Sequence, residues 1–388
     1  MPGRHVEVVL KVAERCNIDC TYCYMFNKGD ESFRRKPKQL SIGAAADIAA
    51  FLRQAVDDGV ASSVRIIFHG GEPLMLRKQQ FAEICQAFID ALKSVCPLYF
   101  SLQTNAMLID DGWLALFSRF KISVGVSLDG PEGVNDRYRI DHQGRGTYAR
   151  TIEGVRKLQE AWRRGDGERP GLLCVIGPDV SGGELYTHFV RDLGVDFVDF
   201  LLPIETWDTA CEETLSYVGP FLESALSAWL ADRGAGVKIR FFNTFFAFLL
   251  RQPQANEESP LDSIIITVAS DGTFGPDDTM RLLGEDSLYD FDVRATSLAA
   301  YLDDPRLMSI DQDSRSAPAE CGDCAWQNYC RGGAANGRMV NRYAPGQGFG
   351  RRSIVCDGLK STYALMAHHL VEAGLSEDDI LRRLENVA

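Results

Sequence analysis

The chain has 388 residues, 45% apolar and 24% charged, which is the balance of an ordinary globular protein with room for two or three domains. Its formal net charge of −13 argues against a nucleic-acid partner, because such binding needs basic surfaces. No run of about 18 uncharged apolar residues is present, so no membrane span or membrane partner is expected. The N-terminal stretch lacks the apolar core of a signal peptide, and we therefore predict a cytoplasmic protein. Eleven cysteines in such a chain indicate metal binding rather than disulfides.

The first half of the chain alternates short apolar runs with helical patterns. Runs rich in β-branched or aromatic residues and bounded by turn formers predict strands at 6–12, 64–68, 98–102, 122–128, 171–176 and 195–202. Apolar residues at helical spacing predict helices over 42–60 and 79–95. Such alternation predicts a parallel α/β sheet, and six units are too few for a closed eight-stranded barrel. We therefore expect a partial, TIM-like (β/α)6 barrel.

The second half is less regular. Residues 217–250 are apolar at helical spacing, a polar break follows at 252–260, and 264–274 has the pattern of a hairpin. The stretch 321–356 is rich in glycine and cysteine and is expected to fold around metal. These changes in composition predict three parts, a barrel at 1–216, a helical bridge at 217–260 and a C-terminal domain at 261–388.

Three cysteines directly after the first predicted strand have the spacing C-x3-C-x2-C: Cys16, Cys20 and Cys23. Thiolates are soft ligands that suit iron–sulfur clusters or zinc. A four-iron cluster needs four ligands, so this loop would leave one iron open for a ligand that is not protein. Structural zinc is the alternative, but zinc wants four ligands and no further cysteine or histidine occurs before His69.

This loop, with the aromatic residue Tyr22 before its last cysteine, resembles the radical S-adenosylmethionine (SAM) enzymes. The resemblance implies a [4Fe–4S] cluster whose open iron binds SAM, and a 5′-deoxyadenosyl radical that abstracts a hydrogen atom from substrate. Further motifs follow other predicted strands in the family's order, and the resemblance implies that they contact SAM: Tyr22, Gly70, Gly71, Glu72, Pro73, Asn105, Ser127 and Arg139. The glycines would allow close backbone approach, and the Glu72 carboxylate could receive the SAM ammonium. Turn formation or capping remains the alternative for each of these positions.

A second cysteine set, Cys321, Cys324, Cys330 and Cys356, resembles the SPASM extension of peptide-modifying radical SAM enzymes. The full pattern has seven cysteines for two auxiliary clusters, but Ala334 and Asp277 stand where two of them are expected. We therefore expect one auxiliary [4Fe–4S] cluster, closed by four thiolates, with structural zinc as the alternative. The fold class implied is a radical SAM barrel with a C-terminal SPASM-type domain.

Asp278 corresponds to an acidic residue that acts as general base in sulfatase-maturing relatives, and a base suits an oxidation that releases a proton as well as an electron. Asp277 is the rival for this role, and an ordinary turn aspartate is the alternative for both.

The general appearance resembles maturases that form cyclophanes in ribosomally made peptides. This implies a carbon–carbon crosslink between an aromatic side chain and a β-carbon of a precursor peptide with leader and core parts. The resemblance also implies flavodoxin or ferredoxin as electron donor. Because the chain starts almost at its first strand, we expect leader recognition by the barrel, the bridge or a separate leader-binding protein. The alternatives are thioether formation, anaerobic sulfatase maturation and, outside enzymes, an iron–sulfur electron-transfer protein.

Overall fold

The computed structural model describes residues 3–232, 236–250, 263–284, 286–336 and 338–385. Contacts divide the chain into two compact units. The first unit comprises Met1–Leu128, Asn135–Gly171 and Asp262–Met308, and the second comprises Asp129–Val134, Leu172–Leu261 and Ser309–Ala388. No helix in the described ranges is long and apolar enough to cross a membrane.

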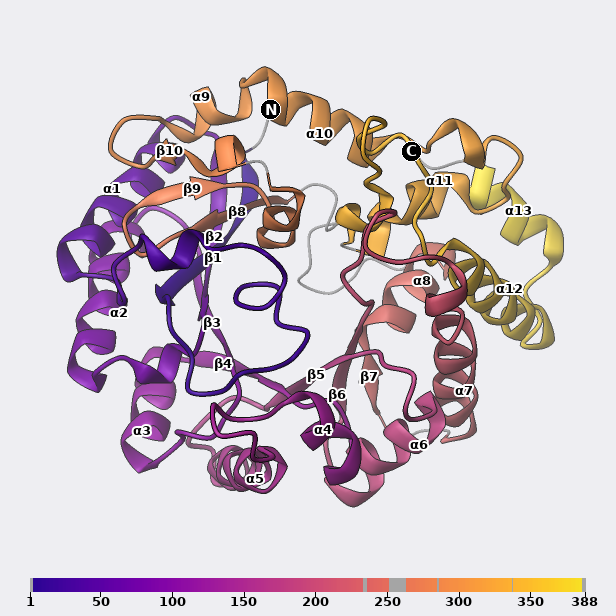
Figure 1. Cartoon of the computed structure of the whole chain (residues 1–388), viewed down its shortest axis with the longest axis horizontal. Coiled ribbons are helices and arrows are strands. Elements are labelled where there is room, and N and C mark those ends of the chain that lie inside the picture. The colour runs from indigo at the N-terminus through magenta and orange to yellow at the C-terminus, as the bar shows by residue number, and fades with distance from the viewer. Residues whose placement is uncertain (1–2, 233–235, 251–262, 285, 337, 386–388) are drawn as a thin grey trace. The chain divides into compact units, whose positions relative to one another are not determined.

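The first unit is built on four neighbouring parallel strands, β1 (Arg4–Ala13), β2 (Ala61–Gly70), β3 (Leu98–Thr104) and β4 (Ile122–Ser127). Their alternate side chains are buried, as expected for strands that pack against helices. Figure 1 shows three helices along one side of these strands, α1 (Ile42–Asp57), α2 (Lys78–Leu92) and α3 (Asp111–Phe120). The strands and helices predicted for this half of the chain are confirmed.

Local sequence explains where two of these helices begin. The Ser41 side chain accepts a hydrogen bond from the Ala44 amide at the start of α1, and Asp110 accepts one from the Trp113 amide at the start of α3. Both are residues that favour the N-cap because their side-chain oxygens satisfy amides that have no partner within the helix. The remaining helices that fall at least partly in this unit are α4 (Glu132–Tyr138), α5 (Tyr148–Arg163), α9 (Leu298–Leu302) and α10 (Pro305–Arg315).

A hairpin from the second half of the chain completes the sheet of the first unit. Strand β8 (Ile264–Val268) pairs in parallel with β1, with Ile264 opposite Val6. Strands β9 (Thr273–Gly275) and β10 (Phe291–Asp292) follow in antiparallel pairing. The structure thus groups 262–308 with the first unit by contact, whereas the sequence placed them in the C-terminal domain. The predicted boundary at 260/261 lies outside the described residues, and the three-domain division stays a prediction.

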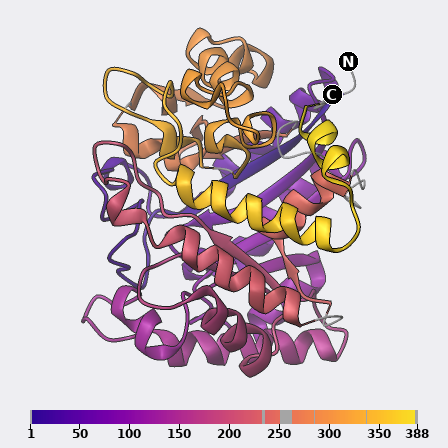
Figure 2. The same ribbon diagram turned by 90° about the vertical axis from the view of Figure 1, so that its right-hand side faces the viewer.

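The second unit has three parallel strands, β5 (Gly171–Val175), β6 (Phe197–Leu201) and β7 (Lys238–Ile239). Its helices are α6 (Gly182–Tyr186), α7 (Val218–Ala231), α8 (Arg240–Leu250), α11 (Gln327–Cys330), α12 (Cys356–Glu372) and α13 (Glu377–Glu385). The predicted helical stretch 217–250 is therefore two helices, α7 and α8, with β7 between them. Figure 2 shows α7 and α12 side by side, where a Cβ on Gly358 would lie 2.7 Å from the Gly219 backbone nitrogen.

Candidate functional site

The three-cysteine loop follows β1 and is held by backbone hydrogen bonds within the first unit. The Asp19 amide donates to the Ile140 carbonyl over 2.7 Å, and the Thr21 amide donates to the Tyr138 carbonyl over 2.9 Å. The Cys23 amide donates to the Cys20 carbonyl over 3.0 Å, which turns the chain between two of the predicted ligands. Loops at the carboxyl ends of parallel strands are where α/β folds place active sites.

The thiols of this loop lie close enough to influence one another. Burial and the nearby Glu72 raise the pKa of Cys16 to about 12, and burial and the Cys20 thiol raise the pKa of Cys23 to about 11. The Cys16 and Cys23 thiols are therefore protonated at neutral pH, and a bound metal would displace these protons. Three free thiols on one turn fit the open-iron cluster that the spacing predicts.

The Gly70–Gly71 turn packs directly on the chain that enters the cysteine loop. Gly70 has a φ of +119°, and a Cβ there would lie 2.2 Å from the Ala13 carbonyl oxygen. A Cβ on Gly71 would lie 2.1 Å from the Arg15 carbonyl oxygen. Only glycine fits such a close approach of two backbones. The turn therefore sets the position of the cysteine loop as well as that of Glu72.

Glu72 is buried, with 1% of its surface exposed. One carboxylate oxygen accepts hydrogen bonds from the Thr104 hydroxyl at 2.7 Å and the Leu74 amide at 3.0 Å, and the other accepts one from the Asn105 amide at 2.9 Å. Burial raises the pKa of Glu72, and these donors oppose the rise. The carboxylate thus links the ends of β2 and β3, a role that the sequence did not indicate. Its contact with the SAM amine stays a prediction.

The other predicted SAM-contacting side chains converge on the same loop or on a neighbouring strand end. Asn105 donates from its side-chain amide to the Asn17 side-chain oxygen over 2.8 Å, and Asn17 is the residue after Cys16. Arg139 donates to the Tyr22 hydroxyl over 2.8 Å, and its charge lowers the pKa of both Cys23 and Glu72 against the effect of burial. Ser127 accepts a hydrogen bond from the Gln103 side chain over 2.7 Å. Pro73 opens a short 3-10 turn that Glu72 caps.

Asp278 lies in a buried group of charged and aromatic side chains. Its carboxylate pairs with Lys11 at 2.7 Å and with Arg281 at 3.2 Å, and it accepts a hydrogen bond from the Tyr24 hydroxyl at 2.7 Å. Burial would raise the pKa of Asp278, but the Lys11 and Arg281 charges lower it to about 2. Because Tyr24 directly follows Cys23, its hydroxyl connects Asp278 to the cysteine loop.

Asp277, the rival of Asp278, has a different place. Its side chain caps the short 3-10 helix Asp278–Leu283 by accepting a hydrogen bond from the Thr279 amide at 3.0 Å. This is the turn-capping role that the sequence held as the alternative for both aspartates.

The sequence reasoning missed Lys11, Tyr24 and Arg281. Lys11 is the one charged residue in the apolar strand run VVLKVA, and a buried lysine needs a partner, so it carried a usable signal. Its neighbour across the β1–β2 register is His69, whose Nδ1 atom is buried with no hydrogen-bond partner in the described part of the chain. Burial lowers the pKa of His69, so its imidazole is neutral at neutral pH.

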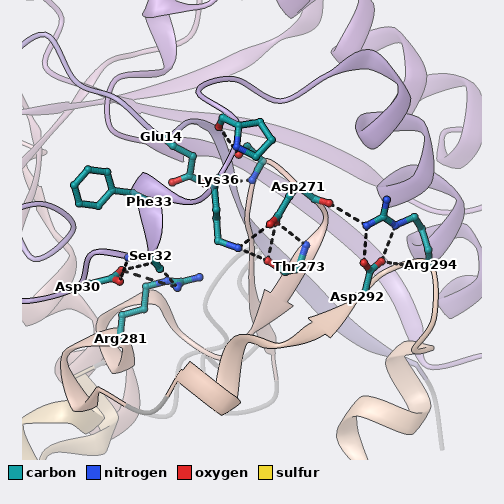
Figure 3. Close-up of polar contacts among 12 residues, drawn as sticks. Glu14, Asp30, Ser32, Phe33, Lys36, Asp271, Thr273, Arg281, Asp292 and Arg294 are labelled. Atoms are coloured by element: carbon teal, nitrogen blue, oxygen red, sulfur yellow. Dashed lines mark hydrogen bonds and ion pairs between the residues drawn. The ribbon is translucent and has the colours of Figure 1, made fainter.

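The segment after the cysteine loop is fastened to the hairpin that leads to Asp278 (Figure 3). Lys36 is directed between Asp271 and Thr273, at 2.9 Å from the carboxylate and 2.6 Å from the hydroxyl. Arg281 donates to the Ser32 hydroxyl over 3.1 Å in the same view. The hairpin β8–β9 and the cysteine loop thus belong to one connected polar site within the first unit.

The second cysteine set lies in the second unit. Cys321 ends the 3-10 helix Ala319–Cys321, Cys330 ends α11 and Cys356 begins α12, while the Cys324 amide donates to the Cys321 carbonyl over 3.0 Å. Burial raises the pKa of Cys330 to about 12, and the Cys356 and Cys321 thiols add to the rise. Cys324 adds to the raised pKa of Cys321, after burial and Cys356. All four cysteines are free and mutually close, which fits a shared four-thiolate site.

No group of three or more histidine, cysteine or acidic side chains is gathered tightly enough to hold a single metal ion in the described ranges. The fit of both cysteine sets to a cluster therefore rests on their loops, their free thiols and their mutual electrostatic influence.

Comparison with known proteins relates part of the chain to a family. Residues 10–185 match the family model of the Radical SAM superfamily. The cysteine-type anaerobic sulfatase-maturating enzyme of Clostridium perfringens is 25% identical over 333 residues, which cover 82% of this chain and 85% of that protein. The serine-type enzyme of Klebsiella pneumoniae is 24% identical over 349 residues, which cover 86% of this chain and 84% of that protein.

Solved structures agree on the fold. The anaerobic sulfatase-maturating enzyme anSMEcpe with bound AdoMet aligns with a TM-score of 0.77 at 20% identity, over 95% of this chain and 99% of that one. The same enzyme with AdoMet and a Cp18Cys peptide also aligns with a TM-score of 0.77, at 19% identity, over 95% of this chain and 98% of that one. The predicted α/β fold class is confirmed.

Residues 10–185 thus match the Radical SAM superfamily, and the predicted SAM and [4Fe–4S] cofactors are confirmed. Which cysteines hold the clusters stays a prediction. The predicted cyclophane-forming activity is wrong, because the similar characterised proteins are anaerobic sulfatase-maturating enzymes, which the sequence reasoning held only as an alternative. That prediction depended on two missing cysteines, and these bear on the number of clusters rather than on the product.

Proposed function

We propose that this protein is a radical SAM maturase of the anaerobic sulfatase-maturating type, which oxidises a cysteine or serine side chain of a polypeptide substrate. Similarity over more than four fifths of the chain to both a cysteine-type and a serine-type enzyme supports this class. The observation that carries the proposal is the buried Asp278 carboxylate. It accepts a hydrogen bond from the hydroxyl of Tyr24, the residue that directly follows Cys23. A proton acceptor beside the cysteine loop is what a hydrogen-abstracting oxidation requires.

The residues of the first unit that would hold the cofactors are Cys16, Cys20 and Cys23 for the cluster, and Tyr22, Gly70, Gly71, Glu72, Pro73, Asn105, Ser127 and Arg139 for SAM. When bound, SAM and this cluster supply a radical that removes one hydrogen atom from the substrate. The chain's own contribution is placement: the two glycines let the β2 turn approach the cysteine loop, and Glu72 links the ends of β2 and β3.

Oxidation must also remove a proton and an electron. Asp278 is the base in this proposal: its carboxylate is ionised at neutral pH, and the Tyr24 hydroxyl connects it to the cysteine loop. Because the Lys11 and Arg281 charges lower its pKa to about 2, it can accept only a proton that the oxidation has made strongly acidic. Asp277 is less suited because its side chain caps a 3-10 helix. Cys321, Cys324, Cys330 and Cys356 would hold one auxiliary cluster, which accepts the electron. Flavodoxin or ferredoxin is the proposed donor of the electron that starts each turnover.

The experiment is an anaerobic reaction of the reconstituted protein with SAM, dithionite and paired peptides that differ only in a central cysteine, serine or alanine. We expect 5′-deoxyadenosine together with a mass change in the cysteine or serine peptide, and no change in the alanine peptide. Formation of 5′-deoxyadenosine with none of the peptides modified would exclude this substrate class.

The base is tested separately with Asp278→Asn, which should leave SAM cleavage intact and reduce oxidised peptide by about a hundredfold or more, the usual contribution of a general base. Because this change leaves Lys11 buried without its partner, the double variant Lys11→Met/Asp278→Asn is the stability control. Unchanged product in Asp278→Asn would remove Asp278 from this role.

A further inference from the structure

Arg342 is among the largest fully buried side chains of the second unit, with 1% of its surface exposed. It ends the 3-10 helix Met339–Arg342, between Cys330 and Cys356 in the sequence. No carboxylate lies within ion-pair distance of its guanidinium in the described part of the chain. Burying a cation without a paired carboxylate is costly in proteins, so the fold must gain something from it.

The guanidinium donates to five backbone carbonyl oxygens. Its partners come from the three segments that carry the four cysteines: Asp313 at 2.6 Å, Ser316 at 3.2 Å, Arg331 at 3.2 Å, Phe349 at 2.6 Å and Arg351 at 3.2 Å. Two of these carbonyls precede Cys321, one follows Cys330 and two precede Cys356. A single planar group with several donors therefore ties the segments together.

The ionisable groups that act on the Arg342 charge are one carboxylate, Asp313, and two of the cysteines. Burial lowers the pKa of Arg342, while the Asp313, Cys321 and Cys330 side chains act in the opposite direction.

Two further donors face the same cysteines. The Tyr363 hydroxyl on α12 points to the Cys330 sulfur at 4.0 Å, and the Arg352 guanidinium lowers the pKa of Cys356 against the effect of burial. Arg352, unlike Arg342, is neutralised by carboxylates, with Glu212 and Asp357 each at 2.8 Å. Arg342 is thus a buried cation at this site that pairs directly with no carboxylate in the described part of the chain.

We propose that Arg342 is the counter-cation of the four-cysteine site, where it joins the cysteine-bearing segments and offsets the negative charge of an all-thiolate iron–sulfur cluster. This inference rests on the auxiliary cluster of the proposed function. A four-thiolate cluster becomes more negative on reduction, so a buried cation beside it stabilises the reduced form and raises its midpoint potential. Arg342 then makes the cluster a better acceptor of the substrate electron. Its role is positioning and electrostatic, because it acts through the cluster and contacts no substrate.

The test uses a Cys16→Ala/Cys20→Ala/Cys23→Ala background, so that the auxiliary site alone is measured. Roughly four irons per chain are expected there. In this background, Arg342→Met removes the charge and the hydrogen-bond donors. Arg342→Lys keeps the charge but loses the planar guanidinium and its several N–H donors. We expect a more negative midpoint potential in Arg342→Met, measured by anaerobic titration, and a smaller shift in Arg342→Lys. Arg315→Met is the matched control, because Arg315 is exposed and paired with Asp311 at 2.7 Å.

The outcomes separate the two proposals. Zinc, or no iron, in the parent background would overturn the auxiliary cluster itself. Full iron with an unchanged potential in Arg342→Met would overturn the counter-cation role and leave the cluster standing. If Arg342→Met cannot hold iron, retention of iron by Arg342→Lys supports the role of the positive charge. Equal loss of iron in both variants would show that the guanidinium hydrogen bonds, and not the charge, retain the cluster, and would overturn the proposal.

Discussion

The two cysteine sets differ in what surrounds them. The loop at Cys16–Cys23 lies among paired charges, where carboxylates such as Glu72 and Asp278 meet hydrogen-bond donors and the cations of Lys11, Arg139 and Arg281. The set at Cys321–Cys356 lies near a buried guanidinium, that of Arg342, which pairs directly with no carboxylate in the described part of the chain. Three thiolates beside polar groups leave room for a ligand from solution, whereas four thiolates would form a closed site whose negative charge a nearby cation partly offsets. The first arrangement suits SAM chemistry, and the second suits electron transfer.

The variant that should separate the functions of the two cysteine sets most clearly is Cys16→Ala/Cys20→Ala/Cys23→Ala, which removes the three thiols of the first loop. We expect 5′-deoxyadenosine formation to fall below detection while iron at the second set remains, because the two sites share no ligand. Cys85→Ala is the control, since Cys85 is a buried single cysteine on α2. Residual SAM cleavage in the triple variant would break the distinction between the sites.

The converse change is Cys330→Ala. It should leave SAM cleavage in place and reduce oxidised peptide by at least about a hundredfold, the upper range of losses seen even for outer-shell changes. Quantifying both products in one reaction checks this. Full peptide oxidation without auxiliary iron would show that the second set has only a structural task.

Gly71→Ala tests how far the first site depends on backbone contact. The new Cβ would overlap the Arg15 carbonyl oxygen, so we expect a cost of roughly 1–3 kcal/mol, as for other overpacked positions, with a lower Tm and weaker iron retention. Gly177→Ala is the control, because a Cβ there meets no atom within 4 Å. Equal Tm values for the two variants would mean that the loop can move away.

Lowering the pH should weaken the ion pairs of Asp278 in the first site and leave the charge of Arg342 unchanged. Because the folded pKa of Asp278 is lowered to about 2, its pairing stabilises the protein above the ordinary value of 3.8 and is lost as pH falls from there through the folded value. The contribution is on the order of 2 kcal/mol. The pH dependence of Tm should therefore flatten over that interval in Lys11→Met/Asp278→Asn. An unchanged acid profile would show that other carboxylates dominate.

The smallest effect is expected at the edge of the first site. Lys36→Met removes a partly exposed pair with Asp271 and should cost about 1 kcal/mol or less, because such pairs are screened by solvent. Arg53→Met, which breaks the exposed Arg53–Asp57 pair, is the comparison. A larger loss of Tm at Lys36 than at Arg53 would show that the fastening drawn in Figure 3 matters for the fold of the loop.

Local sequence was enough for part of the site. The spacing of Cys16, Cys20 and Cys23 after a β-branched strand predicted the cluster loop, and Gly70–Gly71 predicted a close backbone approach. Asp278 was also found, through its place in the motif. Lys11 and Arg342 were not found, because a single charged residue carries no periodic signal and its partners are distant in the chain.

By itself, the sequence determined the alternation of strands and helices and the chemistry of its two thiol sets, because periodicity and ligand spacing are local properties. Only the tertiary structure decided that β8 pairs with β1, that Lys11 meets Asp278 and Tyr24, and that one guanidinium joins the segments around four cysteines. Those contacts depend on how buried charges find partners when the chain packs. The free energy of burial, rather than any local pattern, selects them.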